Sequence, residues 1–355
     1  MPEAVCLKVP KKLGELAIRL VAELDLFNRN LQIHQTEGSL YIPLTVDLSY
    51  DAFSVFEKSL SKYELSVHNF VEREKRHLVP ADFLADTLPP DLLVLIPRAI
   101  DFVGDIAIVE IPAELIDYKN AIGEAILKAH KHVSTVLAKS GAVEGIYRIR
   151  DFEVIAGDNK TATLYREYGC TYYVDVAKAY FSPRLSTEHN RVALAVKAGE
   201  TVVDLFAGVG PFVVPIAKKH PNVKIYAVDV NPDAVAFLKR NVALNRAEKQ
   251  VVPIVGDARQ IVQEQLLGKA DRVIMNLPET SLEFVDVACK ALKPEGGIIH
   301  YYCFVNDSGP LKTAKTQLTQ AVTQNKRQVK EFLLAKSVRE VAPYTWQVVL
   351  DAKIQ

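Results

Sequence analysis

From residue 200 onward, short apolar segments alternate with segments of helical composition, and this alternation restricts the fold more than any other feature of the chain. The expected elements are 201–205, 213–219, 224–229, 233–245, 251–255, 271–275, 282–292 and 297–304. Such alternation predicts a parallel sheet covered by helices on both faces. Two further strands, 331–338 and 345–352, flank a polar turn at 342–344 and should pair antiparallel at one edge. We therefore predict an α/β, doubly wound and mostly parallel sheet over residues 179–355.

The first part of the chain predicts a small α+β domain over residues 1–68. A helix is expected at 11–26, where apolar residues recur at helical spacing, and a strand is expected at 40–44. Residues 69–95 are first polar and then contain Leu88, Pro89 and Pro90, a composition that supports neither a strand nor a long helix. We therefore expect a linker at 69–95.

A second small α+β domain is expected over residues 96–178. It should begin with a strand at 100–112 that has a buried centre at Ile106–Val109, followed by a helix at 117–138 that ends at Lys139, Ser140 and Gly141. Three strands should then form an antiparallel set, with 157–160 as a hairpin turn. These strands are 152–156, 162–166 and 171–176.

The composition is typical of a soluble globular chain, with 355 residues, 49% of them hydrophobic and 24% charged, and a formal net charge of zero. The four cysteines (Cys6, Cys170, Cys289 and Cys303) show no C-x-x-C spacing, so we expect neither a disulfide framework nor a metal site. No apolar run approaches the ~20 residues that span a bilayer. We expect a cytoplasmic monomer without a membrane contact. Residues 201–355 carry more basic than acidic side chains, which suits RNA but also an ordinary mixed surface.

A glycine turn follows the first strand of the predicted large sheet. The strand ends at Asp204, and the turn contains Gly208 and Gly210 before the next helix begins. Glycines at such a corner let a ligand approach the backbone closely. The next strand ends at Asp229, about 20 residues later, where doubly wound folds carry an acid for ribose hydroxyls. Together these features predict a nucleoside-binding crevice.

The acids of this crevice favour a cationic cofactor. No third glycine completes a G-x-G-x-x-G pattern after Gly210, and Asp204 stands beside the turn. A carboxylate attracts a sulfonium or an amino group and repels a phosphate. S-adenosylmethionine carries both cationic groups, and Asp257 at the end of the third strand should lie near its adenine amino group. For any single one of these acids, helix capping is an equally simple explanation.

The fourth strand delivers Asn276, Leu277 and Pro278 to the same edge of the sheet. An amide followed by a rigid proline could hold a flat ring with amino and carbonyl edges beside the cofactor. Tyr180 and Phe181 could supply a stacking wall for a base, or could be ordinary core aromatics.

Five segments together resemble a known family. They are 180–189 (YFSPRLSTEH), 204–212 (DLFAGVGPF), 273–278 (VIMNLP), 300–304 (HYYCF) and 341–350 (VAPYTWQVVL). In these segments the chain resembles the archaeal and eukaryotic tRNA (guanine-N1-)-methyltransferases that act at position 37, over about residues 100–355. The resemblance implies a Rossmann-like class I methyltransferase domain that uses S-adenosylmethionine. It also implies a middle RNA-binding domain that closes over it, and an N-terminal domain that touches the tRNA body, so tRNA, by its anticodon loop and body, is the expected partner.

The resemblance also implies roles for single residues. Glu188 matches the general base, Arg148 matches the basic residue that faces the guanine carbonyl, and Asn276 matches the residue that holds cofactor and base. The expected cofactor-binding residues are Tyr180, His189, Asp204, Phe206, Gly208, Gly210, Asp229, Val230, Asp257, Ala258, Asn276 and Pro278. The expected RNA-binding residues are Arg148, Tyr180, Arg184, Asn276 and Pro278. Without the resemblance, Glu188 reads as a helix-start acid and Arg148 as part of a surface ion pair.

The chemistry of guanine agrees with these roles. Its N1 carries a proton that must leave before a methyl group can be accepted, and a carboxylate base can contribute ~10²–10⁴-fold. The charge then moves to O6, where a fixed guanidinium stabilises it. The base must also leave the stack of the anticodon loop.

Other activities remain possible from the sequence. The main alternative is an aminocarboxypropyl transferase of the wybutosine pathway, which shares fold and cofactor. A cytosine-C5 methyltransferase is disfavoured because no cysteine closely follows Pro278, and an amino-group methyltransferase because Leu277 and Glu279 replace the expected proline and aromatic residue. A catalytically silent RNA-binding scaffold is a fourth possibility.

Overall fold

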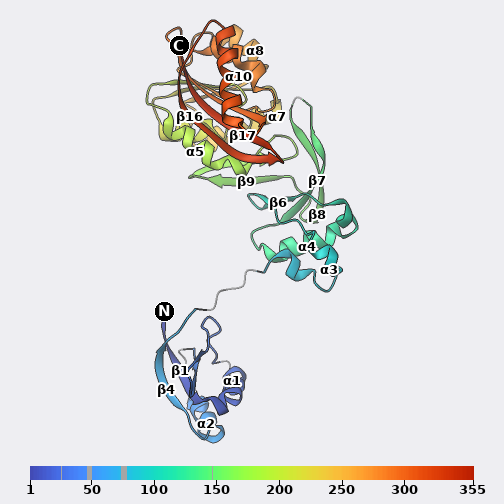
Figure 1. Cartoon of the computed structure of the whole chain (residues 1–355), viewed down its shortest axis with the longest axis vertical. Helices are drawn as coiled ribbons and strands as arrows, with labels where there is room; N and C mark the ends of the chain where they lie inside the picture. The colour runs from blue at the N-terminus through green and yellow to red at the C-terminus, as the bar shows by residue number, and fades with distance from the viewer. Residues whose placement is uncertain (25, 46–49, 73–77, 146) are drawn as a thin grey trace. The chain divides into compact units, whose positions relative to one another are not determined.

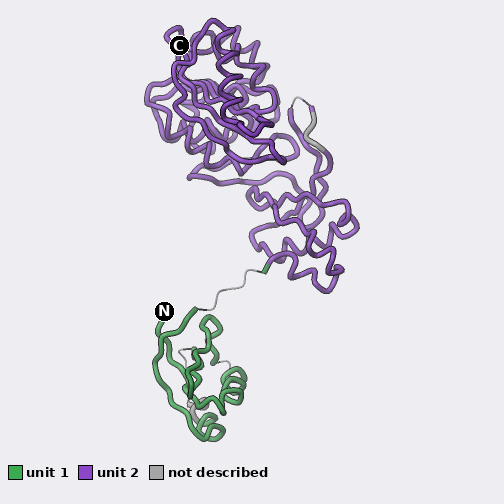
Figure 2. The backbone as a smooth tube through the Cα atoms, in the orientation of Figure 1, with its two compact units in different colours: residues 1–78 green, residues 79–355 purple. Residues whose placement is uncertain are grey.

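A computed structural model of the chain describes residues 1–24, 26–45, 50–72, 78–145 and 147–355. The chain forms two compact units, Met1–Leu78 and Val79–Gln355, drawn in green and purple in Figure 2. Part of the expected linker, residues 73–77, lies outside the described residues. Within the described parts of the chain, no helix combines the length and the apolar character that crossing a membrane requires.

The first unit contains a four-stranded antiparallel sheet in the order β2-β3-β1-β4. Its strands are β1 (Glu3–Pro10), β2 (His34–Gln35), β3 (Ser39–Pro43) and β4 (Glu64–Asn69), and its helices are α1 (Gly14–Glu23) and α2 (Tyr50–Ser59). The helix expected at 11–26 is shorter, because β1 extends to Pro10 and Lys11–Leu13 forms a 3-10 turn. The buried side chains of Leu7, Ala17, Val21 and Ile42 hold sheet and helix together.

The second unit begins with a smaller sheet, which we call the middle sheet, in the order β5-β6-β7-β8. Its strands are β5 (Asp101–Val103), β6 (Ile106–Val109), β7 (Thr135–Glu144) and β8 (Ile149–Gly157), and its main helix is α4 (Lys119–Ala129). The helix expected at 117–138 is therefore wrong after Ala129. Residues 135–138 run parallel to β6, and Lys139, Ser140 and Gly141 lie within β7 instead of ending a helix. The β-branched Val133, Thr135 and Val136 favour a buried strand once β6 offers a partner.

The hairpin expected at 157–160 is also wrong. Strand β8 pairs with β7, whereas β9 (Ala162–Glu167) pairs with β10 (Cys170–Asp175) in a separate two-stranded ribbon. Gly157 has a φ of +80°, and a Cβ there would lie 2.0 Å from the carbonyl oxygen of Ser134. The glycine therefore lets β8 pack closely against the start of β7, and the turn leads from one sheet to the next.

The third sheet, which we call the large sheet, has the order β13-β12-β11-β14-β15-β17-β16. Its strands are β11 (Thr201–Asp204), β12 (Lys224–Asp229), β13 (Val251–Val255), β14 (Arg272–Met275), β15 (Gly297–Asn306), β16 (Val329–Ala342) and β17 (Thr345–Ile354). Strands β11 to β15 are parallel, and β17 and β16 add the antiparallel edge (Figure 1). The doubly wound sheet predicted from the sequence is thus confirmed. The strand order reverses between β11 and β14, and ligands bind at such switch points in open α/β sheets.

Helices cover both faces of the large sheet and bury two separate cores. One face carries α5 (Ser186–Ala195), α6 (Val213–Lys219) and α7 (Pro232–Leu244), whereas the other carries α8 (Ala258–Ile261), α9 (Val285–Ala291) and α10 (Pro310–Gln324). Figure 1 shows α10 beside β16 and β17, against which it packs. The sequence did not predict α5, α8 or α10.

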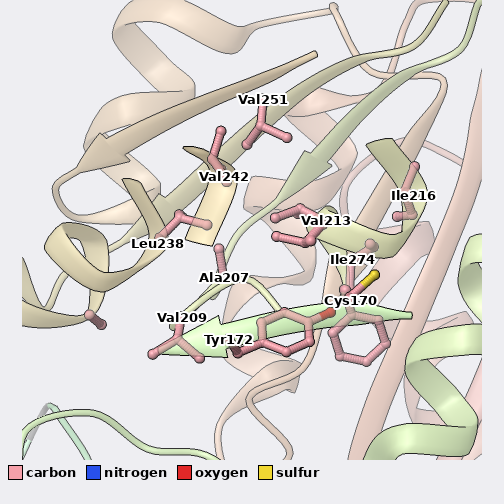
Figure 3. Packing of buried hydrophobic residues seen from close by; sticks show 14 of the residues in the cluster. Cys170, Tyr172, Ala207, Val209, Val213, Ile216, Leu238, Val242, Val251 and Ile274 are labelled. Atoms are coloured by element: carbon pink, nitrogen blue, oxygen red, sulfur yellow. The ribbon is translucent and has the colours of Figure 1, made fainter. Parts of the chain in front are cut away.

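The ribbon of β9 and β10 is attached to the first of these faces. Figure 3 shows Tyr172 of β10 in one cluster with Val209 and Val213. Asn241 of α7 and Asn245, the residue just after this helix, bind the backbone of β10: the Asn241 amide bonds both the N–H and the carbonyl of Tyr173, and Asn245 does the same at Thr171. These contacts fix the position from which the segment 180–185 enters the site.

Candidate active site

A cavity of about 420 Å³ lies at the carboxyl ends of the parallel strands. Its wall is built from the turns after β11, β12, β13 and β14, from the segment that leads into α5, and from residues of the β7–β8 loop. Pockets for small molecules and cofactors have volumes of roughly 300–1,000 Å³ and favour such switch points. Ten of the predicted site residues line it: Arg148, Tyr180, His189, Phe206, Gly208, Asp229, Val230, Asp257, Ala258 and Asn276.

The two glycines of the turn have different reasons to be glycine. Gly208 has a φ of +53°, and a Cβ there would meet only the Tyr180 carbonyl, at 3.8 Å, so the backbone is open on the cavity side. Gly210 is not among the lining residues, and its Cβ would lie 2.5 Å from Leu238 Cδ1. Gly208 therefore suits the approach of a ligand, whereas Gly210 allows α7 to pack against the turn.

Asp229 at the end of β12 holds the turn from the side. Its Oδ2 accepts a hydrogen bond from the Gly208 N–H at 2.7 Å, and its Oδ1 accepts one from the Asn231 N–H at 2.9 Å. Burial raises the pKa of Asp229, and the two backbone donors offset this only in part. Each carboxylate oxygen keeps a lone pair, so Asp229 can accept two further hydrogen bonds from a diol.

Asp204 lies behind the turn and is not among the residues that line the cavity. Its side chain is fully buried; Oδ1 accepts a hydrogen bond from the Phe206 N–H at 3.1 Å, and Oδ2 has no partner within the described residues. Burial raises its pKa to about 7, against the effect of the Phe206 N–H. Asp204 therefore supports the turn, and its contact with a cofactor stays a prediction.

Asp257, which follows β13, caps a helix and also lines the cavity. Its Oδ1 accepts hydrogen bonds from the N–H groups of Arg259 and Gln260, at 2.9 and 3.1 Å, and so caps α8. The residue also lines the cavity beside Ala258. The capping explanation thus holds for this acid, and it does not prevent the exposed side chain from meeting a ligand.

Asn276 and Arg148 bring unsatisfied polar atoms to the cavity wall. The Asn276 Oδ1 is buried and has no hydrogen-bond partner among the described residues. Arg148 comes from the β7–β8 loop, where it adopts a left-handed backbone with a φ of +55°. One of its terminal nitrogens donates to Glu279 Oε1 at 2.8 Å, its guanidinium lies 5.2 Å from the Tyr180 ring centre, and its buried Nε has no partner in the part of the chain described. Buried polar atoms of this kind normally bond to a ligand or to water.

His189 is buried on α5 and also lines the cavity. Its Nδ1 lies 2.8 Å from Glu167 Oε1, and its ring meets the Phe212 ring edge-on at 4.7 Å. Glu167 was not predicted from the sequence, because it lies on β9, far from any motif. The pair fixes the orientation of the imidazole.

Glu188 does not line the cavity, although its neighbour His189 does. Its buried carboxylate accepts hydrogen bonds from Tyr302 Oη at 3.0 Å, from Arg191 Nε at 2.9 Å and from Lys336 Nζ. Burial acts to raise the pKa of Glu188, but the hydrogen bond of Lys336 and the charge of Arg191 outweigh burial and lower it below the usual value. Glu188 is therefore ionised and held by three donors.

The network around Glu188 continues through the sheet. Arg191 also donates to Asp351, which accepts a hydrogen bond from His300 Nδ1 at 2.6 Å. The His300 Nε2 lies 2.8 Å from an Arg272 nitrogen and so accepts from it, which requires a neutral imidazole. The sequence did not predict these contacts: Arg191 lies on α5 itself, whereas the other members of the network lie on β14, β15, β16 and β17.

Arg184 and Pro278 were also predicted as site residues, and neither lines this cavity. Arg184 donates to both carboxylate oxygens of Asp101, at 2.5 and 3.0 Å, and lines a neighbouring cavity. Pro278 is buried, its carbonyl accepts a hydrogen bond from the Phe304 N–H, and it does not line the cavity. Leu277, which was expected at this edge of the sheet without a role, does line it, as do Glu279 and Phe284, which were not predicted. Within the described residues, no cluster of His, Cys, Asp and Glu could hold a metal ion.

Three family models match the chain in succession. The tRNA methyltransferase 5 N-terminal domain matches residues 6–50, the TYW2 N-terminal domain matches 81–161, and the TRM5/TYW2 methyltransferase domain matches 163–330. The chain is 38% identical to the tRNA (guanine(37)-N(1))-methyltransferase Trm5b of Pyrococcus abyssi, with 99% of both chains covered. It is 34% identical to Trm5b of Methanocaldococcus jannaschii, with 99% of this chain and 98% of the relative covered.

Solved structures agree with these matches. The crystal structure of wild-type Trm5b from Pyrococcus abyssi superposes with a TM-score of 0.74 at 35% identity, with 99% of both chains covered. A complex of aTrm5 with tRNALeu superposes with a TM-score of 0.70 at 32% identity, with 99% of this chain and all of that chain covered. TYW2 of Pyrococcus horikoshii in complex with MeSAdo gives 0.66 at 30% identity, but only 78% of this chain is covered, against 97% of that one. The chain therefore belongs to the tRNA (guanine(37)-N(1))-methyltransferases and is an S-adenosylmethionine-dependent methyltransferase.

Proposed function

We propose that the chain methylates N1 of the guanosine at position 37 of tRNA. The observation that carries this proposal is the cavity wall at which Asn276 of the large sheet and Arg148 of the β7–β8 loop present buried polar atoms without partners. Relatives of nearly equal length bear the name of this activity, and one similar structure contains tRNALeu.

The cavity fits S-adenosylmethionine on its Gly208 side. This cofactor supplies a methyl group on a positively charged sulfur. The backbone at Gly208 is open, and Asp229 has lone pairs left for the ribose hydroxyls. Asp257 and Ala258 would border the adenine. Asn276 would stand between the two ligands, with its free Oδ1 as an acceptor.

Arg148 is suited to the charge that develops on the guanine O6. Its terminal nitrogen is engaged by Glu279, but a guanidinium has five N–H donors in a planar fork, and the Nε is unused. The Tyr180 ring lies beside the guanidinium and would stack on a flat base, which would hold the base next to Arg148. Preorganised donors of this kind contribute about 3–4 kcal/mol in known sites.

Glu188 would accept the N1 proton in this proposal. Its carboxylate starts as the conjugate base, because the neighbouring cations lower its pKa. The same cations make it a weak base, and it lies outside the cavity wall. A side-chain rearrangement that releases Lys336 would therefore have to precede proton transfer. The alternative is that Glu188 positions α5 without touching the substrate.

The remaining parts of the chain would bind the tRNA. We propose that residues 1–68 contact the tRNA body, that 69–95 link this domain to the next, and that 96–178 bind the anticodon loop and supply Arg148 to the methyltransferase domain, 179–355. Arg150 of the middle sheet lines the neighbouring cavity and forms no ion pair with any described residue, and this positive charge supports an RNA-binding role.

The test compares two tRNA transcripts that differ only in having G or A at position 37. Each is incubated with the protein and S-adenosylmethionine labelled either in the methyl group or in the carboxyl group, then digested to nucleosides. We expect methyl label in 1-methylguanosine from the G transcript alone. Label from the carboxyl group would instead identify aminocarboxypropyl transfer. Methylation of the A transcript, or of another guanosine, would overturn the proposal.

A second substrate is worth including because of one relative. The tRNA 4-demethylwyosine(37)-methyltransferase Taw21 of Saccharolobus solfataricus is 35% identical, with 72% of this chain and 94% of the relative covered. A tRNA that carries 4-demethylwyosine at position 37 tests this activity in the same assay.

A further inference from the structure

A second cavity, of about 360 Å³, adjoins the first and shares part of its wall. The shared residues are Arg148, Tyr180, Phe181 and Ser182. The rest of its wall comes from the middle sheet and the residue after β6 on one side, from the edge strand β16 on the other, and from the segment between β10 and α5. A ligand that reaches past Arg148 and Tyr180 from the first cavity therefore enters the second.

Basic side chains outnumber acidic ones in this second cavity. The basic residues are Lys139, Arg148, Arg150, Arg184 and Arg339, and the acidic residues are Asp101, Glu110 and Glu340. Two of the acids are already neutralised inside the cavity: Asp101 by Arg184 and Glu110 by Lys139, the latter at 3.4 Å. The carboxylate of Glu340 accepts a hydrogen bond from the Tyr344 N–H.

Two arginines of this cavity lack a counter-charge. Arg150 on β8 is half-buried and makes no ion pair or side-chain hydrogen bond with any described residue. Arg339 on β16 donates through Nε to Gln347 Oε1 at 2.9 Å, and Gln347 is neutral and only 1% exposed. The buried amide therefore orients the Arg339 guanidinium and leaves its terminal N–H groups for another acceptor. Two guanidinium groups without an ion-pair partner, against the single unpaired carboxylate of Glu340, leave the cavity positively charged and predict an anionic ligand.

We propose that Arg150 and Arg339 bind the phosphodiester groups that flank the methylated nucleotide. This inference rests on the proposed function, because it takes the first cavity as the site of the flipped base. A nucleotide whose base contacts Arg148 and Tyr180 leaves its sugar and phosphates on the other side of these two residues, in the second cavity. Guanidinium groups match phosphate oxygens in geometry and charge. The two arginines come from opposite walls, so they hold the backbone of an extruded nucleotide from both sides.

The carboxylate of the methionine part of S-adenosylmethionine is the other anion that two arginines could bind. The two sources differ in their dependence on RNA. If the ligand is a phosphodiester, loss of either arginine weakens RNA binding and leaves the cofactor affinity unchanged. If it is the cofactor carboxylate, the reverse holds.

The experiment measures the Kd of an unmodified tRNA transcript over a range of salt concentrations, without cofactor, for the wild type, Arg150→Gln and Arg339→Gln. Arg166→Gln is the control, because Arg166 is exposed on β9 and lines neither cavity. We expect each cavity variant to raise the Kd about tenfold at low salt and to reduce the salt slope by about 0.7, the value for one phosphate contact to a single strand. The Kd for S-adenosylmethionine should stay within twofold.

Arg339→Lys accompanies this set, because Arg339→Gln removes the donor to the buried Gln347 and could disturb the fold. The lysine keeps the charge and should restore most of the salt slope. A Kd and slope equal to those of Arg166→Gln, or a weakened cofactor Kd with unchanged RNA binding, would overturn the inference. The binding assay needs no methyl transfer, so absence of 1-methylguanosine would count against the proposed function alone.

Discussion

Lys336 on the edge strand β16 and Glu188 on α5 form an ion pair, although they are far apart in the sequence. The lysine is 37% exposed, whereas the carboxylate is buried and also held by Arg191 and Tyr302. The pair keeps the proposed base ionised and also occupies it. Lys336 is the most exposed of the three donors, so it is the one that a tRNA phosphate can draw away.

Replacement of Lys336 should change the pH dependence of methyl transfer. Lys336→Met removes one of the two cations that lower the pKa of Glu188, so this pKa should rise. The acidic limb of the single-turnover rate should therefore move to higher pH. Lys330→Met, at an exposed position of the same strand, is the control. A profile identical to that of the wild type would mean that the titration of Glu188 does not limit the reaction.

Glu188→Gln should separate catalysis from stability. We expect the single-turnover rate to fall by roughly 10²-fold or more, with cofactor affinity within a few-fold. The amide also leaves Arg191 and Lys336 without their carboxylate, so the free energy of unfolding should fall. The double variant Glu188→Gln/Lys336→Met removes one of these cations and should recover part of the stability but none of the rate. If the rate recovers with the stability, Glu188 only positions α5.

The residues of the site that could be predicted from sequence share one property. Asp229 ends a strand of the large sheet, Gly208 and Asn276 follow two others, and parallel strands bring their carboxyl ends to one edge. Residues at the carboxyl ends of successive strands in the sequence are therefore close together in the structure. The partners of Glu188 and Arg148 do not follow this rule. Lys336 reaches Glu188, and Glu279 reaches Arg148, through side-chain directions that only the packed structure determines.

The errors in the middle sheet have a related cause. The apolar residues at 133–138 fit one face of a helix as well as a buried strand, and a short segment does not separate the two periods. Pairing with β6 favours the strand. Helix α4 separates β6 from residues 133–138 in the sequence, so the short segment alone does not reveal this pairing. The sequence indicates a chain reversal at 157–160, but this alone does not determine the pairing partners of the strands before and after it.

Asp229→Ala should weaken the binding of S-adenosylmethionine by ~1–3 kcal/mol, because the hydroxyl acceptors are lost. The Gly208 N–H also loses its acceptor, which adds to the effect. Asp233→Ala is a matched control, since this acid is exposed on the next helix and outside the cavity. Equilibrium dialysis measures both, and wild-type affinity of Asp229→Ala would place the ribose elsewhere.

Asp204 should make the stability of the cofactor-free protein depend on pH. Its pKa in the folded state is raised to about 7, above the value of ~4 expected in the unfolded chain. The folded state therefore holds the proton more tightly, and its stability is greatest below pH 4 and is lost as the pH rises towards 7. Asp204→Asn keeps the acceptor for the Phe206 N–H and never ionises. Its unfolding free energy relative to the wild type should rise by up to a few kcal/mol between pH 4 and 7 in urea titrations, whereas a constant difference would contradict the raised pKa.

Removal of the first unit should affect tRNA binding more than chemistry. Residues 79–355 form a compact unit of their own and contain both cavities, so the truncated chain should fold and keep its affinity for S-adenosylmethionine. If residues 1–68 contact the tRNA body, their loss removes uniform binding energy, which raises KM and leaves the single-turnover rate at saturating tRNA within a few-fold. The two constants are measured on a full tRNA and on an anticodon stem-loop of the same sequence. The stem-loop lacks the tRNA body, so the truncation should change its KM little, and an equal rise of KM for both substrates would show that the first unit does not read the body.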